Sequence, residues 1–301
     1  MNDFAITIDG LEKYYGSFKA LHGVDLKVNR GEILGFLGPN GAGKTTTIRC
    51  MLDLIHPQGG TISVLGLNPQ AEPEAIKARV GYLPGELHLD ENMTAQQIFR
   101  YFNRLRGNRS NWDFIEELSD RLKLELKTPI KNFSHGNKQK VGVVQALMHR
   151  PELLLLDEPT GGLDPLMQQE VLRMLAETQD NGATVFFSSH IISEVQAVAD
   201  RVAIIRAGKI VEVAETASLL NRSMRQVRIR FQQPTEAEEL YKLPGVELVA
   251  KDDGLGVLLQ VEGAMDPLIK TLAKYPVNDF ETERTSLEEI FLAYYEGEED
   301  N

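Results

Sequence analysis

The chain has 301 residues, a length that suits one large domain and one small domain. Hydrophobic residues make up 42% and charged residues 25%, which is the balance of an ordinary globular protein with a core. The formal net charge of −12 argues against nonspecific nucleic-acid binding, which usually needs a basic face, so no nucleic-acid partner is expected. The single cysteine, Cys50, cannot form an internal disulfide, which is typical of an intracellular chain.

The sequence predicts neither a signal peptide nor a membrane-spanning segment. Its first residues lack a basic region followed by an apolar stretch. The longest apolar runs, such as Leu153–Leu156, fall far short of the roughly 20 residues that a spanning helix needs. If a membrane is involved, another chain is expected to supply the spanning part.

Short apolar strands alternate with amphipathic helices over residues 1–220. Buried runs without polar alternation favour parallel strands that are covered on both faces. The helix after Lys44 carries apolar residues at helical spacing. The pattern predicts an α/β fold with strands at Phe4–Ile8, Val24–Val28, Glu32–Leu37, Leu153–Leu156, Thr184–Ser188 and Val202–Ile205.

A helical insertion is expected within this α/β region, over about residues 89–150. The pattern changes after Leu89, and two helices are predicted at Thr94–Arg106 and Trp112–Leu122. Gly107 and Asn108 form the break between them.

A second, small α+β domain is expected over residues 221–301. The order βαββαβ resembles a ferredoxin-like unit, and this domain is expected to regulate, dimerise or brace the larger one. The run Glu296–Asp300 is expected to be a solvated end. The predicted strands are Gln226–Phe231, Val246–Ala250, Val257–Val261 and Asn278–Glu283, and the predicted helices are Glu236–Tyr241, Pro267–Tyr275 and Leu287–Tyr295.

A glycine-rich loop follows the apolar strand Ile33–Leu37 and matches the pattern G-x-x-x-x-G-K-[ST]. Glycines let such a loop wrap closely around phosphates, and the helix N-terminus that follows adds partial positive charge. Lys44 can reach the outer phosphates, and the Thr45 hydroxyl can bind Mg²⁺. The residues expected to bind the nucleotide are Gly38, Pro39, Asn40, Gly41, Ala42, Gly43, Lys44, Thr45 and Thr46. This motif does not distinguish kinases, GTPases and transport ATPases, and a chance glycine-rich turn is the structural alternative.

Two acids, Asp157 and Glu158, end the apolar strand Leu153–Leu156. In a doubly wound sheet, ligands bind at the carboxyl ends of the strands, so this strand would deliver both acids to the phosphate site. Asp157 suits Mg²⁺, and Glu158 is placed to orient or deprotonate the attacking water. The structural alternative is an acidic strand end that faces solvent.

The segment Phe133–Lys140 lies about twenty residues before the acidic strand. Ser134 is placed as a helix N-cap ahead of an apolar stretch. Together with the loop and the acids, the segment resembles the LSGGQ signature of ATP-binding-cassette (ABC) ATPases. His135 stands in place of the first glycine and Asn137 in place of the glutamine.

The resemblance to ABC ATPases covers roughly residues 4–220. It implies that Ser134, Gly136 and Asn137 contact ATP held by a second copy of the chain, so that two ATP molecules are sandwiched between two cassettes. A helix N-terminus with a free hydroxyl suits a γ-phosphate. An ordinary helix cap explains Ser134 alone, but not the whole spacing.

Two more motifs carry the resemblance. Gly161–Asp164 resembles the loop that crosses the dimer interface, where Asp164 would help set the geometry near the partner's phosphate loop. Asp164 is also placed to cap the helix that starts at Pro165. His190 ends a strand and resembles the switch histidine, which would hydrogen-bond the γ-phosphate and help position water.

Two further positions are less specific. Tyr15 lies 23 residues before Gly38 and resembles the aromatic residue that stacks on adenine, with Tyr14 as a competitor and a core tyrosine as the structural alternative. The family usually places a Mg²⁺-binding glutamine after Leu83-Pro84, where this chain has Gly85 and Glu86. Glu86 would substitute as a carboxylate ligand, or the chain uses no side-chain ligand there.

The resemblance implies an ABC cassette with an antiparallel β subdomain and a helical subdomain, binding ATP and Mg²⁺. One cassette, a short helical insertion and an acidic character favour a transporter subunit over a soluble ABC ATPase of translation or DNA repair, or a sensor-coupled regulatory ATPase. The expected partners are a second cassette and a separate integral-membrane permease, at the cytoplasmic face of the membrane. The variant signature, Leu83–Glu86 and the ending Ser286–Phe291 resemble the exporter-type (ABC-2-like) branch, which handles drugs, peptide antibiotics or lipid-linked molecules.

Overall fold

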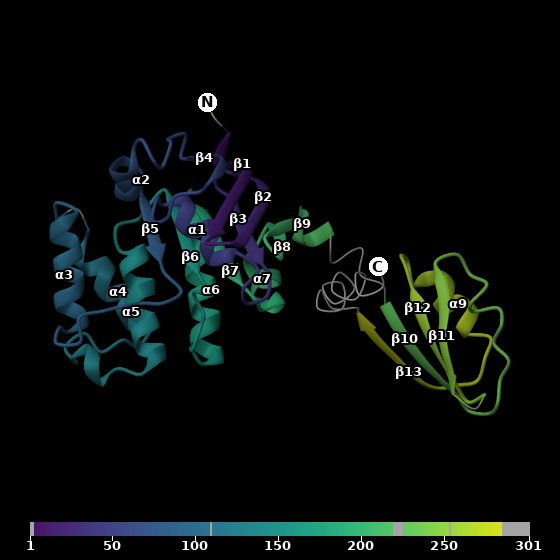
Figure 1. Ribbon diagram of the computed structural model, residues 1–301. Helices are drawn as coiled ribbons and strands as arrows, with labels where there is room; N and C mark the ends of the chain where they lie inside the picture. Colours follow the sequence, from purple (N-terminus) through teal and green to yellow (C-terminus); the bar gives the residue numbers. More distant parts are fainter. Residues whose placement is uncertain (1–2, 109, 219–224, 253, 285–301) are drawn as a thin grey trace. The chain divides into compact units, whose positions relative to one another are not determined.

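The computed structural model describes residues 3–108, 110–218, 225–252 and 254–284. The chain divides into two compact units, Met1–Thr216 and Ala217–Asn301 (Figure 1). The predicted boundary between residues 220 and 221 falls outside the described ranges and stays a prediction. Within these ranges, none of the helices combines the length and the apolar character that crossing a bilayer requires.

A six-stranded sheet forms the centre of the first unit, in the order β5-β6-β7-β3-β8-β9. All neighbours are parallel except β8 and β9, which are antiparallel. The carboxyl ends of β3, β6 and β7 therefore meet at one edge, and each is followed by a predicted motif. The strands are β3 (Ile33–Leu37), β5 (Val80–Leu83), β6 (Leu153–Asp157), β7 (Thr184–Ser189), β8 (Arg201–Arg206) and β9 (Lys209–Glu215).

A second, antiparallel sheet has the order β2-β1-β4. Its strands are β1 (Phe4–Tyr15), β2 (Phe18–Asn29) and β4 (Gly59–Val64). Both β1 and β2 extend well beyond the predicted Phe4–Ile8 and Val24–Val28, because β-bulges interrupt the alternation of apolar and polar residues without ending the pairing. The hairpin between them brings Tyr15 opposite Phe18.

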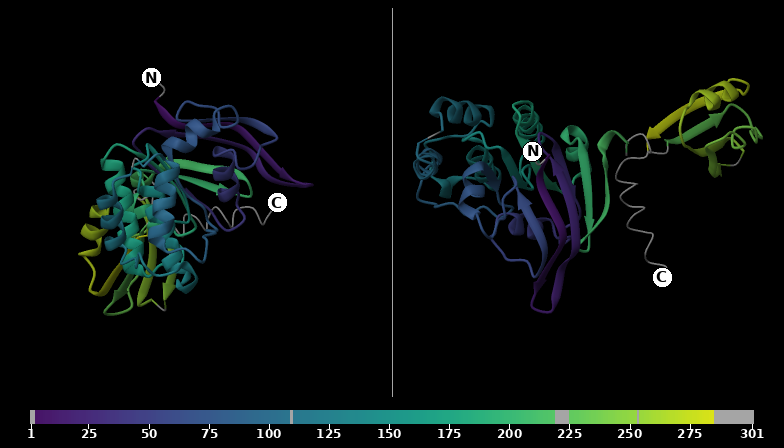
Figure 2. Two further views of the ribbon diagram at one scale, coloured as in Figure 1. Left: turned by 90° about the vertical axis from the view of Figure 1, so that its left-hand side faces the viewer. Right: turned by 90° about the horizontal axis from the view of Figure 1, so that it is seen from above.

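Helices α3, α4 and α5 gather on one side of the first unit, where they form the expected helical insertion (Figures 1 and 2). Thr94 and Gln97 form a capping box at the start of α3, and Asn111 caps α4. The helices are α1 (Lys44–Met51), α2 (Pro73–Arg79), α3 (Ala95–Leu105), α4 (Trp112–Arg121), α5 (His135–Leu147), α6 (Pro165–Asp180) and α7 (Ile192–Val198), with a 3₁₀ turn at Ile130–Asn132.

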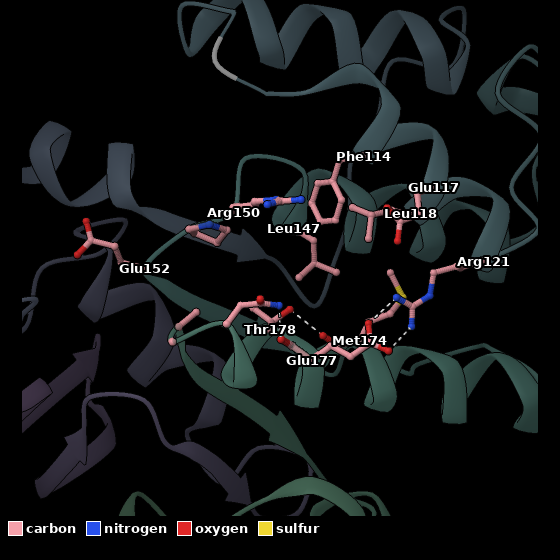
Figure 3. A pocket seen from close by; sticks show the side chains of 14 residues that line it. Phe114, Glu117, Leu118, Arg121, Leu147, Arg150, Glu152, Met174, Glu177 and Thr178 are labelled. Atoms are coloured by element: carbon pink, nitrogen blue, oxygen red, sulfur yellow. Dashed lines mark hydrogen bonds and ion pairs between the residues drawn. The ribbon is translucent and has the colours of Figure 1, made fainter.

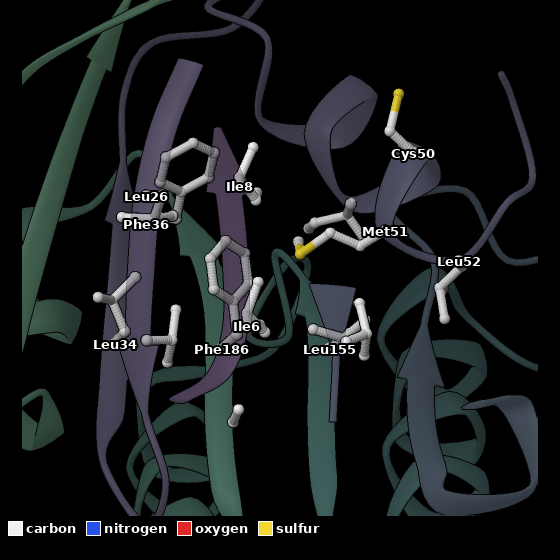
Figure 4. Packing of buried hydrophobic residues seen from close by; sticks show 14 of the residues in the cluster. Ile6, Ile8, Leu26, Leu34, Phe36, Cys50, Met51, Leu52, Leu155 and Phe186 are labelled. Atoms are coloured by element: carbon white, nitrogen blue, oxygen red, sulfur yellow. The ribbon is translucent and has the colours of Figure 1, made fainter. Parts of the chain in front are cut away.

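One hydrophobic core of the first unit lies between its two sheets and includes one face of α1 (Figure 4). The rings of Phe36 and Phe186 pack with centroids 5.2 Å apart. Cys50, Met51 and Leu52 bring the end of α1 into the same cluster. Because α1 begins directly after the glycine-rich loop, this packing fixes the loop at the edge of the parallel sheet.

The second unit is an antiparallel sheet with the order β11-β12-β10-β13, covered by α9. This is the strand order of the split βαβ arrangement expected from the sequence, with the first and third strands side by side. The elements are β10 (Arg225–Phe231), β11 (Val246–Asp252), β12 (Gly256–Val261), α9 (Asp266–Leu272) and β13 (Val277–Arg284).

The predicted helix Glu236–Tyr241 is wrong: Glu238–Tyr241 form turns, and the two residues before them are irregular. Ala237 and Leu240 still bury their side chains in the small core. So short a segment makes too few helical hydrogen bonds to offset the entropy of nucleation, and the apolar contacts are made without a helix. The predicted helix Leu287–Tyr295 and the acidic end lie outside the described residues.

Candidate active site

The glycine-rich loop connects β3 to α1 and approaches the neighbouring strands closely. The Gly38 amide donates a hydrogen bond to the Ser189 carbonyl at 3.2 Å. A Cβ atom on Gly38 would lie 2.4 Å from the Ile205 carbonyl oxygen, so no larger residue fits there. Gly43 has a φ of 111° and caps α1, a conformation that side chains disfavour. The loop shape predicted from the glycine spacing is therefore enforced by its surroundings.

Lys44 is buried at the base of this loop, with 5% of its surface exposed. Its ammonium donates hydrogen bonds to the carbonyls of Gly38 at 2.6 Å and Pro39 at 3.1 Å. The same nitrogen lies 3.4 Å from Glu158 Oε1. The cation thus lies between the loop and the second acid of β6.

Asp157 connects three segments at the edge of the parallel sheet. Its side chain is 1% exposed, and it accepts hydrogen bonds from the hydroxyls of Thr45 at 2.6 Å and Ser188 at 2.5 Å. A hydroxyl and a carboxylate are oxygen donors that suit Mg²⁺, which usually takes one or two protein ligands and completes its shell with water and phosphate. Among the described residues no cluster of three or more His, Cys, Asp or Glu could hold a metal ion.

Glu158 has a φ of 50°, a left-handed backbone that is uncommon for a residue with a side chain. Its amide donates to the Ser188 carbonyl and hydroxyl, and its carbonyl accepts a hydrogen bond from Gln139 Nε2 at 2.9 Å. Its carboxylate oxygen Oε1 lies 3.2 Å from His190 Nδ1. The predicted base and the predicted switch histidine therefore meet, on the same oxygen that approaches Lys44.

A hollow of about 250 Å³ opens above the loop. Tyr15 and Phe18 lie at its rim and are 46% and 64% exposed, which leaves flat aromatic faces available for stacking. Tyr14 is less exposed and its ring lies under the Lys19 ammonium, so the geometry favours Tyr15 over Tyr14. The hollow is lined by Tyr15, Phe18, Ala20, Pro39, Asn40, Gly41, Gly43, Lys44, Thr45, Thr46 and Glu158.

The signature segment and the loop after Glu158 lie against each other instead of lining this hollow. Ser134 caps α5 by accepting from the Asn137 amide, and Asp164 caps α6 by accepting from two amides. A Cβ atom on Gly136 would lie 2.5 Å from the Gly162 carbonyl oxygen. Ser134 and Asp164 are exposed, so this surface is available to another molecule.

Glu86 is exposed and does not line the hollow. Gly85 is the residue that lies against the acidic site, because a Cβ atom placed on it would be 2.9 Å from Asp157 Oδ2. The position where the family usually has a glutamine side chain is thus occupied by backbone alone.

Sequence reasoning missed Phe18 and Gln139. Phe18 joins the hollow because it lies opposite Tyr15 across the β1–β2 hairpin, a pairing that the sequence pattern did not predict. Gln139 is 4% exposed and donates to the Glu158 carbonyl, a contact that its place between Lys138 and Lys140 does not indicate.

A larger hollow of about 490 Å³ lies between α4, the end of α5 and α6, and holds none of the predicted motif residues (Figure 3). Arg121 crosses it to Glu170 at 2.7 Å and to Glu177 at 2.5 Å. These hydrogen bonds raise the pKa of the Arg121 guanidinium, and the hydrogen bond to Glu177 has the larger effect. Arg150 stacks on Phe114 with the guanidinium 4.4 Å from the ring centre. This larger hollow lies between the helical insertion and α6, and it is separate from the hollow above the glycine-rich loop.

Comparison with known families gives two matches. Residues 21–161 match the model described as ABC transporter, and residues 217–295 match the model described as ATP-binding protein DrrA1-3-like, C-terminal domain.

The daunorubicin resistance ATP-binding protein DrrA3 of Streptomyces coeruleorubidus is 38% identical over 216 residues, 70% of this chain and 68% of the relative. The bacitracin transport ATP-binding protein BcrA of Bacillus licheniformis is 37% identical over 230 residues, 75% of each chain. The daunorubicin/doxorubicin resistance protein DrrA of Streptomyces peucetius is 31% identical over 306 residues, 96% of this chain and 92% of the relative.

Solved structures agree. The ATP-binding subunit of an ABC transporter superposes with a TM-score of 0.65 at 29% identity, over 71% of this chain and 91% of that one. A dimeric bacterial ABC transporter cassette superposes with a TM-score of 0.62 at 21% identity, over 70% of this chain and 98% of that one, and shows the shared fold.

The fold and the site define a P-loop ATPase of the cassette type. The chain belongs to the ATP-binding subunits of ABC transporters, in the exporter-type branch, and this family hydrolyses ATP to power transport. The predicted family, fold class and function are confirmed, and the alternative of a soluble or regulatory ABC ATPase is not supported.

Proposed function

We propose that this chain hydrolyses ATP at the loop Gly38–Thr46, using Glu158 as the base for the attacking water and His190 to hold the γ-phosphate and that water. His190 contacts the Glu158 carboxylate oxygen that also approaches the Lys44 ammonium. The Lys44 ammonium and the loop amides neutralise the charge that develops on the phosphate oxygens. Tyr15 stacks on the adenine ring.

Mg²⁺ fits the donors at the carboxyl end of β6, and we propose that Thr45 and Asp157 hold it. When bound, it would neutralise charge on the outer phosphates. Ser188 orients the Asp157 carboxylate through its 2.5 Å hydrogen bond, which leaves the second oxygen directed at Thr45. We assign no role to Glu86.

A second copy of the chain is proposed to complete each site with Ser134, Gly136, Asn137 and Asp164. The support is that these residues lie together, partly exposed, and outside the hollow of their own chain. ATP would then close two cassettes face to face, and the motion would drive transport. A cassette that shares this fold has a dimeric structure, which supports such a pairing.

The remaining partner is proposed to be a separate integral-membrane permease, with the cassette bound at its cytoplasmic face. We propose a drug or a peptide antibiotic as the exported cargo, since relatives are named for daunorubicin resistance and for bacitracin transport. The permease would select the cargo. The net charge of −12 supports the absence of a nucleic-acid partner.

The observation that carries this proposal is the convergence of Lys44, Glu158 and His190. The test is Glu158→Gln, with ATP turnover and solution mass measured by light scattering in ATP and Mg²⁺. We expect turnover to fall about 100-fold or more and the mass to double from 33.7 kDa.

The matched control is Glu152→Gln, because Glu152 immediately precedes the same strand at its opposite end, where it pairs with Arg79. This variant should keep its turnover. A Glu158→Gln protein that remains monomeric and hydrolyses ATP at the unmutated rate would show that Glu158 is not the base.

A further inference from the structure

Glu194 is a buried carboxylate that no step of the proposed mechanism uses. It lies on α7 and is 6% exposed. Its Oε1 accepts a hydrogen bond from the Thr160 hydroxyl at 2.5 Å, and its Oε2 accepts one from the Ser189 hydroxyl at 2.6 Å. Among the described residues, its carboxylate meets these two hydroxyls and no ion-pair partner. Burial of a carboxylate without a cation costs free energy, and the two short hydrogen bonds to hydroxyls offset part of that cost.

The two hydroxyls belong to the two loops that carry the proposed hydrolytic groups. Thr160 lies two residues after Glu158, on the loop that follows β6. Ser189 immediately precedes His190, on the loop that follows β7. Glu194 therefore bridges two segments that are about thirty residues apart in sequence, with one oxygen bound to each.

Backbone hydrogen bonds connect this bridge to the reacting groups. The Ser189 hydroxyl also accepts from the Ile191 amide at 2.9 Å, which closes a turn around His190. The Ser189 carbonyl accepts from the Gly38 amide at 3.2 Å, at the start of the phosphate loop. On the other side, the Gly161 amide donates to the Glu158 carbonyl at 3.1 Å. The position of Glu194 is thus coupled to both sides of the Glu158–His190 contact.

We propose that Glu194 is a positioning residue for ATP hydrolysis, which holds the Glu158 loop and the His190 loop in register so that both side chains face the same water. The inference rests on the proposed roles of Glu158 and His190. It does not need Glu194 to touch the substrate. A shift of either loop by an ångström would separate the two groups, which now lie 3.2 Å apart.

The test compares Glu194→Gln and Glu194→Ala with the unmutated chain. The amide keeps the size and one acceptor, whereas alanine removes both hydrogen bonds. We expect kcat to fall about 3- to 10-fold for glutamine and about 10- to 100-fold for alanine. The Kd for a fluorescent ATP analogue should change by less than about 3-fold, because Lys44 and the loop amides are unaltered.

Glu32 provides the matched control. It is also a buried glutamate, 7% exposed, and it accepts hydrogen bonds from Asn29 and Arg201 immediately before β3, at the opposite end of the parallel sheet. Glu32→Gln should lower the thermal midpoint and leave kcat unchanged. The Glu194 variants are compared with this control at equal or higher thermal midpoints. If their kcat is lower there, the loss of turnover comes from the place of Glu194 in the structure and not from a general loss of stability.

A second measurement places Glu194→Ala in a Glu158→Gln background. If Glu194 acts by keeping Glu158 and His190 on the same water, its loss lowers the residual turnover by a smaller factor than it lowers the turnover of the unmutated chain; independent effects would multiply. An equal fall of kcat and ATP affinity, or a multiplicative double variant, would overturn the inference.

If the alanine variant does not fold, the glutamine variant decides by itself: lower kcat at unchanged Kd supports the inference, and unchanged kcat overturns it. Full turnover in Glu158→Gln would overturn the proposed base and this inference together. Lost turnover in Glu158→Gln beside full turnover in both Glu194 variants would overturn this inference alone.

Discussion

His149 makes the stability of the cassette depend on pH in a direction that the structure defines. The residue follows α5, and its Nε2 lies 3.2 Å from the Val80 carbonyl oxygen. A carbonyl only accepts, so Nε2 carries the proton in the neutral ring. The other nitrogen, Nδ1, is buried and has no hydrogen-bond partner among the described residues. Burial and the nearby Arg106 charge lower the pKa of His149 from 6.5 to about 4.

The folded-state pKa lies below the unfolded value, so between pH 6.5 and pH 4 the unfolded chain binds a proton that the folded chain does not. Stability is therefore fully present above pH 6.5 and decreases as pH falls toward 4. From the two pKa values, the loss between about pH 7 and about pH 5 is about 2 kcal/mol for this side chain.

The measurement is urea unfolding followed by the fluorescence of Trp112, the single tryptophan, which lies in the first unit. His149→Gln keeps a donor for Val80 and does not titrate, so its decline between about pH 7 and about pH 5 should be about 2 kcal/mol shallower. Above about pH 7 the ring is neutral in both states, and the two proteins should show parallel profiles. Equal declines in the acid range would refute the argument.

Three further predictions concern a buried thiol, a helix cap and a glycine with a left-handed backbone. Burial raises the pKa of the Cys50 thiol to about 11, so iodoacetamide should modify it at about pH 8 at least about 100-fold more slowly than free cysteine, measured by mass spectrometry. Asp164→Ala removes the cap of α6 and should destabilise the first unit by about 1 kcal/mol in urea unfolding, whereas Asp164→Asn should not. Gly162→Ala adds a Cβ atom 2.4 Å from His135 Cδ2 at a φ of 71°, so both thermal midpoint and ATP turnover should fall; unchanged values would mean that the contact relaxes freely.

The sequence predicted those parts of the fold whose signals are local. The apolar runs of β3, β6 and β7 and the caps of α5 and α6 are all short-range patterns. Strands β4 and β5 were missed, since Gly59–Val64 begins with two glycines and Val80–Leu83 is only four residues long. Their identity as strands is decided by pairing with β1 and β6, which are distant in sequence.

The candidate site likewise has features that the sequence predicts and features that only the folded chain reveals. The phosphate loop and the order of the two acids follow from motif spacing, and the structure brings Thr45 and Asp157 together as expected. Spacing could not show that Gly85 lies against Asp157 or that Glu194 bridges two loops, because these contacts depend on how separate strands end at one edge.

The direction of Glu158 shows why the helical insertion matters to the chemistry. Consecutive residues of a strand point to opposite faces, so an extended chain could not aim Asp157 and Glu158 at the same phosphates. The left-handed backbone at Glu158 redirects its side chain, and such a conformation persists only when its surroundings hold it. One support is Ser188 in β7, and the other is Gln139, which donates to the Glu158 carbonyl from α5. Since α5 begins with the signature segment, a displacement of that helix acts directly on the backbone of Glu158. The same helix that is proposed to meet ATP of a second copy thus helps set the orientation of Glu158 in its own chain.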